Sequence, residues 1–259
     1  MRIIITIPAL LFLFLVNACE LPHQPGQMPT DIVETEFEPG LNIMGVLRAD
    51  DRAGTSFINI NRALTTEEIY SDSIPNFSPY VDYVEVKSVS NNSTFNFTQG
   101  NINGDWWDYK NSYLRVETGE TYELEISAPG FPLLTGQTIV PQKPSILTGS
   151  LLNESETLSF KILHHASAYE YKLYLLFSGG VLEKGVNPSN ETQIQINWDY
   201  DNSLGTPTLL VLSALDENLT RYGNSPISFI PNTYHPDGST VEGGYGCFGS
   251  VSITSVELN

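Results

Sequence analysis

The sequence predicts an all-β protein of two consecutive β-sandwich domains with minimal helix. From Leu41 onward, apolar and polar residues alternate with a period of two in short segments that turn residues separate. One capping box, Thr65-Thr66-Glu67-Glu68, predicts a short helix over residues 66–70, and no other segment sustains a helical period. Pro141 and Pro144 stiffen a junction with about 100 residues on each side, the size of an ordinary sandwich domain.

The expected strands follow from two apolar patterns. Strands with one face on a core and one in water alternate, and this pattern occurs at Ile58–Ile60, Phe95–Phe97, Tyr122–Ile126 and Ile194–Trp198. Two further segments are more continuously apolar, which predicts strands covered on both faces: Tyr169–Phe177 and Thr208–Ala214. A last strand is expected over Ser250–Leu258. The glycine-dense stretch Gly243–Gly249 before it permits positive φ and close backbone approach.

Residues 1–18 are expected to be a lipoprotein signal peptide. Arg2 precedes an apolar run over residues 3–16 that is too short to span a bilayer comfortably and has the length of a signal-peptide core. The run ends in Val16-Asn17-Ala18-Cys19, which resembles a bacterial lipobox. Cleavage before Cys19 and acylation of that residue supply several acyl chains, which together form a stable anchor. The alternative is an ordinary signal peptide followed by an accidental cysteine.

Residues 19–39 are expected to form a lipidated tether. They contain four prolines and little hydrophobic periodicity, which is typical of an extended linker. The anchor predicts attachment to the bacterial outer membrane, on its periplasmic or its cell-surface face.

The charge balance excludes one class of partner. The chain has 12 Lys+Arg against 30 Asp+Glu, for a formal net charge of −18. No basic stripe exists to displace counterions from phosphates, so the sequence predicts no nucleic-acid partner. An acidic chain is also repelled by anionic lipid headgroups, so we expect contact with the membrane through the lipid anchor.

The two halves resemble known sandwich families. Tyr122–Phe131, followed by Thr138–Pro141, resembles the end of a transthyretin-like or carboxypeptidase-regulatory-like sandwich, where a strand leads through a Pro-Gly-aromatic turn to a final strand. Phe160–Ile162 and Ala168–Leu173 resemble two strands of a fibronectin type III-like module, which is an Ig-like sandwich. These resemblances imply a transthyretin-like domain over residues 40–141 and a fibronectin type III-like domain over residues 142–259.

The mature chain as a whole resembles a lipoprotein family of Bacteroidota and their relatives, domain-of-unknown-function 4249. The matching segments are Leu41–Leu47, Ile58–Arg62, Tyr122–Pro141 and, most specifically, Gly243–Gly249. The resemblance implies a cell-envelope lipoprotein that is commonly encoded beside a TonB-dependent outer-membrane receptor. It implies no catalytic residue.

An aromatic cluster is the candidate binding surface. Trp106 and Trp107 are adjacent, so on a strand or turn they cannot both face one core. One of them is therefore expected to be exposed, and exposed aromatic residues mark binding surfaces. With Tyr109 they would contact a sugar or a protein. The alternative is packing on the core and against a neighbouring domain.

The sequence predicts no metal site and no cofactor. Asp199 and Asp201 offer clustered oxygen ligands for calcium, but the EF-hand spacing is missing, and an Asx-rich turn is the alternative. Asp105 and Asp108 present the same two alternatives. His164 and His165 are neighbours that would point to opposite faces of a strand, so they cannot share one metal ion.

Two further residues are singled out. Asp72-Ser73-Ile74 resembles the short O-glycosylation signal of Bacteroidota, which makes Ser73 a candidate modification site. Cys247 lies inside the glycine-dense stretch with no histidine partner suggested by sequence position, and we expect it to be a buried, small apolar group.

Three classes of function remain open. No nucleophile elbow, zinc motif, paired-carboxylate motif or nucleotide fingerprint occurs in the sequence. The first hypothesis is therefore a non-enzymatic cell-envelope lipoprotein that docks on an outer-membrane, TonB-dependent transporter. The second is a surface glycan- or peptide-binding module that uses exposed aromatic residues near Trp106. The third is a hydrolase whose site is not visible in the sequence.

Overall fold

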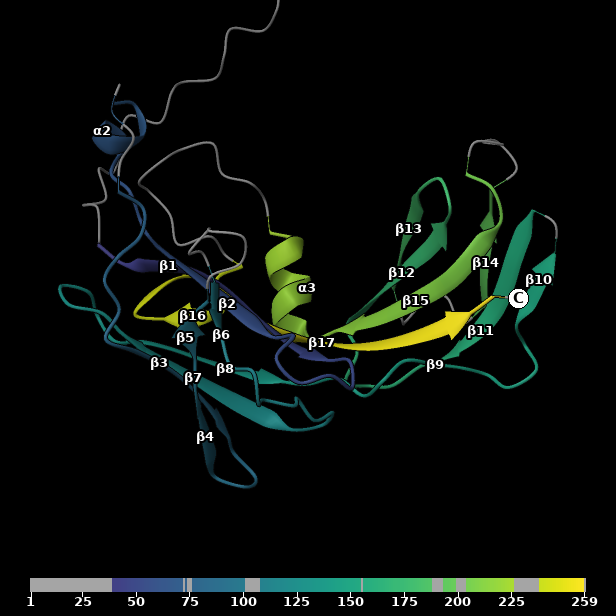
Figure 1. The fold of residues 1–259 in the computed structure, drawn as a ribbon, viewed down its shortest axis with the longest axis horizontal. Helices are drawn as coiled ribbons and strands as arrows, with labels where there is room; N and C mark the ends of the chain where they lie inside the picture. Colours follow the sequence, from purple (N-terminus) through teal and green to yellow (C-terminus); the bar gives the residue numbers. More distant parts are fainter. Residues whose placement is uncertain are drawn as a thin grey trace, which may run out of the picture. The chain divides into compact units, whose positions relative to one another are not determined.

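The computed structural model describes residues 39–71, 73, 76–100, 108–154, 156–187, 193–198, 204–225 and 238–258 (Figure 1). These residues form strands β1 to β17 and two short helices, α2 (Thr66–Ile69) and α3 (Glu217–Gly223). The predicted all-β sandwich class with minimal helix is therefore confirmed.

The largest sheet has eight strands. They are β1 (Leu41–Ala49), β2 (Phe57–Arg62), β5 (Thr98–Gln99), β6 (Asp108–Lys110), β12 (Glu170–Phe177), β13 (Val181–Val186), β15 (Pro207–Leu215) and β17 (Gly244–Glu257). Their order across the sheet is β13-β12-β15-β17-β1-β2-β6-β5, so strands from the two ends of the described chain lie side by side at its centre.

Two smaller sheets complete the fold. The five-stranded sheet contains β3 (Tyr83–Ser88), β4 (Ser93–Asn96), β7 (Thr121–Ser127), β8 (Leu134–Ile139) and β16 (Val241–Glu242), in the order β16-β8-β7-β3-β4. The third sheet contains β10 (Leu152–Glu154), β11 (Thr157–Leu163) and β14 (Gln193–Asn197), and β9 (Ser145–Ile146) pairs with β11.

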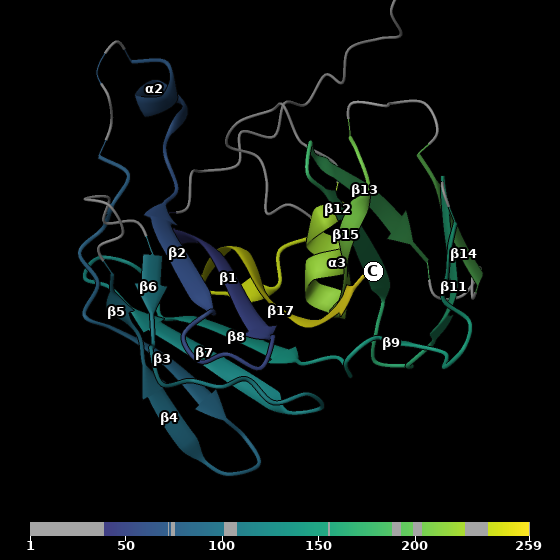
Figure 2. The same cartoon turned by 45° about the vertical axis from the view of Figure 1, so that its right-hand side comes forward.

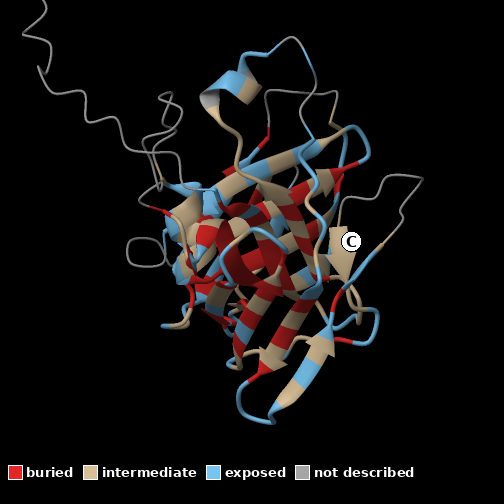
Figure 3. Ribbon diagram, turned by 90° about the vertical axis from the view of Figure 1, so that its left-hand side faces the viewer, coloured by how far each residue is buried: buried red, intermediate tan, exposed pale blue. Residues whose placement is uncertain are grey.

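Each smaller sheet covers part of the eight-stranded sheet and encloses a core. The first core lies between the five-stranded sheet and β1, β2 and β17, and its fully buried side chains include Leu41, Leu124 and Phe248. The second lies between the third sheet and β12 and β15, and includes Phe160 and Tyr171 (Figure 2). Buried residues gather between the layers, and exposed residues occupy the outer faces and turns (Figure 3).

Strand β17 joins the two halves of the eight-stranded sheet, because it lies between β15 and β1. Its first half pairs in parallel with β1, from Leu41 opposite Gly244 to Ala49 opposite Ser252. Its second half pairs antiparallel with β15. The strand begins at Gly244, so the expected start at Ser250 is wrong. The cause is close approach: at Gly246, where φ is +104°, a Cβ atom would lie 2.0 Å from the carbonyl oxygen of Ile43, so the glycine backbone forms the ladder itself.

The domain division at residues 141 and 142 stays a prediction. Strands β16 and β17 come after that boundary, yet they pair with β8 and β1 before it. Val241 and Phe248 likewise belong to the first core. Residues from the end of the chain therefore complete the first sandwich.

The capping box forms as expected. The backbone N–H of Glu68 donates to Thr65 Oγ1 at 3.2 Å, and the backbone N–H of Thr65 donates to Glu68 Oε2 at 3.0 Å. Helix α3 was not expected. Asp216 caps it by accepting a hydrogen bond from the backbone N–H of Leu219 at 2.8 Å, and Glu217 adds an acid to its first turn.

Asp216 also joins three elements through a buried polar network. Its Oδ2 accepts hydrogen bonds from Thr138 Oγ1 on β8, and from the backbone N–H and hydroxyl of Ser250 on β17 at 3.0 and 3.2 Å. The two hydroxyls lie 2.8 Å apart. Burial raises the pKa of Asp216 above its ordinary value, and these donors oppose that shift.

The apolar patterns give the expected strands, with one difference in coverage. On β7 and β14 the buried residues alternate with exposed or half-buried residues, as the sequence indicates. On β12, buried residues alternate with half-buried ones, so its second face is covered only in part. The last four residues of β15, from Leu212 to Leu215, are all buried.

Candidate functional site

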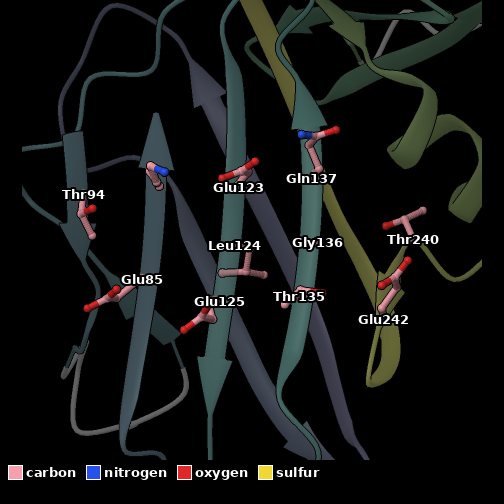
Figure 4. Close-up of a pocket in the computed structure, with 11 residues that line it drawn as sticks. Glu85, Thr94, Glu123, Leu124, Glu125, Thr135, Gly136, Gln137, Thr240 and Glu242 are labelled. Carbon is pink, nitrogen blue, oxygen red and sulfur yellow. The ribbon is translucent and has the colours of Figure 1, made fainter. Parts of the chain in front are cut away.

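A hollow of about 490 Å³ lies on the outer face of the five-stranded sheet. Five charged side chains line it: Glu85 and Lys87 of β3, Glu123 and Glu125 of β7, and Glu242 of β16 (Figure 4). We call this surface the acidic sheet face.

Strand alternation places these side chains together. On β7, Tyr122, Leu124 and Ile126 are buried in the first core, so Glu123 and Glu125 point to the opposite side. On β3, Val84 and Val86 are buried, so the residues between and after them also face outward. The same apolar residues that build the core therefore fix the direction of the acids.

The strand register places two glutamates directly opposite each other. Lys87 lies directly opposite Glu123, which is a favourable cross-strand pair, but Glu85 lies directly opposite Glu125. In the part of the chain that the structure describes, neither Glu85 nor Glu125 forms an ion pair. Two like charges at directly opposed positions destabilise a sheet, so this arrangement costs stability.

One neutral donor supports Glu125. The hydroxyl of Tyr83 donates a hydrogen bond to Glu125 Oε1 at 2.5 Å. This bond favours the neutral phenol beside a carboxylate, and it raises the pKa of Tyr83. This hydrogen bond holds the Glu125 carboxylate in place on the sheet face.

The rest of the lining is uncharged. Thr94, Thr135, Gln137 and Thr240 contribute hydroxyl and amide groups between the carboxylates. Such a surface accepts hydrogen bonds from lysine and arginine side chains over several strands. Among the described residues, no group of three or more His, Cys, Asp or Glu could hold a metal ion.

Several predicted site residues lie outside the described residues. They are the lipidation residue Cys19, the aromatic residues Trp106 and Trp107, and the acidic residues Asp105, Asp199 and Asp201. Of the aromatic cluster, Tyr109 is described on β6. It is half-buried against the first core, and burial raises its pKa.

The remaining predicted residues are described. Ser73 is exposed, and its hydroxyl oxygen lies 3.1 Å from that of Ser71. Asp108 accepts a hydrogen bond from Asn59 Nδ2 at 3.3 Å. His164 and His165 follow the end of β11, so they are not strand neighbours as assumed.

Cys247 is buried as expected. Its side chain is fully inaccessible, and its sulfur lies 3.8 Å from the backbone carbonyl of Asn218. Burial raises the pKa of the thiol to about 12. The residue is therefore a protonated, apolar part of the β17 region.

The acidic sheet face was not recognised from the sequence. The signal was present as alternating acids in Tyr122-Glu-Leu-Glu-Ile126, but alternation alone does not say which strands are neighbours. Only the pairing of β3 with β7, and of β8 with β16, brings Glu85, Glu125 and Glu242 to one surface.

Comparisons with known proteins give distant likenesses. No family model matches the chain, and no curated protein matches it. A solved "biofilm associated protein – BSP domain" structure is 14% identical over 85% of this chain and 29% of its own, with a TM-score of 0.25. The chicken CNTN1 FN1–FN3 domains are 15% identical over 86% of this chain and 66% of their own, with a TM-score of 0.26.

A third structure, of Dpr11 IG1 bound to DIP-gamma IG+IG2, is 11% identical over 70% of this chain and 92% of its own, with a TM-score of 0.22. The chain thus spans 29% and 66% of the length of the first two structures. TM-scores this low establish neither a common fold nor a common function. In the described residues, no helix combines the length and hydropathy needed to cross a membrane.

Proposed function

We propose that this protein is a non-enzymatic, lipid-anchored protein of the bacterial cell envelope that docks a partner protein on its acidic sheet face. The observation that carries the proposal is the pair Glu85 and Glu125, which stand directly opposite each other on an exposed sheet face. The pair lowers stability, and a basic group of a partner placed between the two carboxylates would remove that cost.

The partner is expected to present lysine or arginine side chains. Four glutamates and one lysine line the hollow, and the chain as a whole carries a net charge of −18. Complementary charge speeds association and fixes orientation, and its effect weakens as salt rises. A basic protein surface therefore fits this face better than an apolar one.

The proposed anchor narrows the location of the partner. Acylation at Cys19 and the tether over residues 19–39 would confine the sandwiches to the membrane surface. Such confinement raises the effective concentration of any membrane-embedded partner, so a weak contact is occupied. We propose an outer-membrane, TonB-dependent transporter as this partner, in line with the resemblance to domain-of-unknown-function 4249.

The docking test is a pull-down from native, detergent-solubilised membranes. It compares the wild type with the double variant Glu85→Gln/Glu125→Gln. The matched control is Glu154→Gln/Glu257→Gln, which removes two exposed acids elsewhere. The first variant is expected to fail to retain a specific membrane protein that wild type and control both retain. Its free energy of unfolding is expected to equal that of the wild type or to exceed it by up to about 1 kcal/mol. An unchanged set of partners contradicts docking at this face.

The anchor has its own test. Cys19→Ala is expected to move the protein from the detergent phase to the soluble fraction, because the acyl chains would be absent. Partitioning equal to the wild type would show that residue 19 carries no anchor. Measurable hydrolytic turnover by the purified protein would contradict the non-enzymatic proposal.

A further inference from the structure

A second hollow lies on the eight-stranded sheet, on the face that points away from the second core. It has a volume of about 800 Å³, and it is bounded by the turn between β1 and β2 and by strands β12, β15 and β17. Backbone pairing fixes its walls, since Arg48 lies in register with Val251, and Ile253 with Ser213. We call this hollow the arginine groove.

The groove concentrates positive charge in an acidic protein. Arg48, Arg52 and Lys143 line it, although the whole chain has only 12 Lys+Arg against 30 Asp+Glu. Asp50 and Asp51 line it too, but both are occupied. Asp50 accepts hydrogen bonds from Arg52 Nη2 at 3.1 Å, from the backbone N–H of Arg52 at 3.2 Å and from a threonine hydroxyl at 2.9 Å. Asp51 pairs with Lys143.

Arg48 is the cation with unused capacity. Its one ion pair among the described residues, from Nη2 to Asp50 Oδ2, spans 3.5 Å, which is longer than an ordinary charge-assisted hydrogen bond. Within the described residues, its Nε is buried without an acceptor. The side chain is 36% exposed, so a ligand can reach it. A guanidinium offers five donors in a planar fork that matches a carboxylate in two parallel bonds.

The floor beside Arg48 is apolar. Tyr174, Leu209, Val211 and Ile253 are half-buried side chains that line the groove on the face opposite the second core. Tyr174 lies in register with Val211, so the apolar floor runs across neighbouring strands. The volume is within the range of small-molecule sites. Ser213, Thr254 and Ser255 add hydroxyl groups to the lining.

We propose that the arginine groove binds an apolar carboxylate, with the carboxylate on Arg48 and the hydrophobic body along Ile253, Val211 and Tyr174. This site is separate from the docking face proposed above, because it lies on another sheet. Two sources share this chemistry: an acyl-chain acid, and the C-terminal carboxylate of an apolar peptide.

The test is isothermal titration calorimetry at pH 7 on the mature chain, residues 19–259, with Cys19→Ala so that no detergent is needed. The ligands are decanoate and N-acetyl-Leu-Phe, each compared with its neutral amide. The groove variant is Arg48→Gln. It is expected to fold, since Asp50 keeps its three other donors. Lys161→Gln on β11, an exposed lysine outside both proposed sites, is the matched control for loss of one positive charge.

At least one acid is expected to bind. Its amide is expected to bind about tenfold or more weakly, because the charge-assisted pair with Arg48 is lost. Arg48→Gln is expected to weaken binding of the acid by the same factor, and Lys161→Gln to weaken it by less than about twofold. Binding of decanoate alone identifies an acyl-chain acid, and binding of the peptide alone identifies a peptide C-terminus. The proposal is overturned if neither acid binds, if acid and amide bind equally, or if Arg48→Gln binds like the wild type.

Discussion

Replacing Asp216 by alanine tests how far one buried carboxylate holds β8, α3 and β17 together. The side chain is 3% exposed. Its removal takes the acceptor from two backbone N–H groups, those of Ser250 and Leu219. Removal of the carboxylate costs less at the hydroxyls of Thr138 and Ser250, because they lie 2.8 Å apart and can form a hydrogen bond with each other.

The expected magnitude follows from these two donors. A buried donor left without a partner costs about 1–3 kcal/mol, and the loss at Leu219 includes the helix N-cap. We therefore expect Asp216→Ala to lower the free energy of unfolding by about 2–5 kcal/mol. The matched control is Asp51→Asn, because asparagine also tolerates the φ of 66° at this position, and because the side chain is 83% exposed and its ion pair with Lys143 is worth at most about 1 kcal/mol.

The assay is equilibrium urea unfolding at pH 7, followed by tryptophan fluorescence with the slope m compared among variants. A difference of less than about 1 kcal/mol in the free energy of unfolding between Asp216→Ala and Asp51→Asn would refute the reasoning. The pH dependence adds a second readout. An acid whose pKa is raised on folding contributes stability at pH below its unfolded value, 3.8, and loses it as pH rises through the folded pKa. The stability of the wild type relative to Asp216→Asn should therefore fall as pH rises from about 4.

Three further outcomes are expected. Gly246→Ala should yield no soluble protein with a folded circular dichroism spectrum, because the new Cβ would lie 2.0 Å from the Ile43 carbonyl oxygen. The control Gly130→Ala, where the Cβ would have nothing within 4 Å, should lower the free energy of unfolding by only about 1 kcal/mol. The pKa of Glu68 is lowered to about 2, chiefly by the hydrogen bond from its arginine partner. The contribution of this carboxylate to stability should therefore be present above pH 4.5 and be lost as pH falls towards 2, where the unfolding curves of wild type and Glu68→Gln should converge. The Cys247 thiol, with its pKa raised to about 12, should resist thiol reagents at pH 8 until urea is added, and rapid labelling of the native protein would disprove its burial.

Local patterns predict the parts of this fold that depend on neighbours in sequence. The alternation Tyr122-Glu-Leu-Glu-Ile126 identifies β7 because its period is a property of any half-buried strand. The Thr65–Glu68 capping box identifies α2 for the same reason. Helix α3 is not predicted by the sequence pattern because its seven residues contain no buried side chain and therefore show no apolar period, although Asp216 and Glu217 are ordinary helix-start signals.

The parts that depend on distant partners could not be predicted. The first half of β17 contains glycines that favour loops in isolation, and it becomes a strand because β1 pairs with it. The acidic sheet face requires the register of Glu85 with Glu125, and the arginine groove requires that of Arg48 with Val251. Each depends on which strands meet, and that is decided by packing of the whole chain.

The late position of β17 in the chain sets an order of events during synthesis. Its residues leave the ribosome about 200 residues after those of β1, yet they form the parallel ladder beside β1 and supply Phe248 to the first core. We expect the growing chain to display an open β1 edge and uncovered apolar side chains until Gly244–Ser252 arrive. An unpaired edge beside exposed apolar surface is a template for aggregation. A truncated chain that ends before Gly244 should therefore be degraded completely by proteases, including the residues that had already been synthesised.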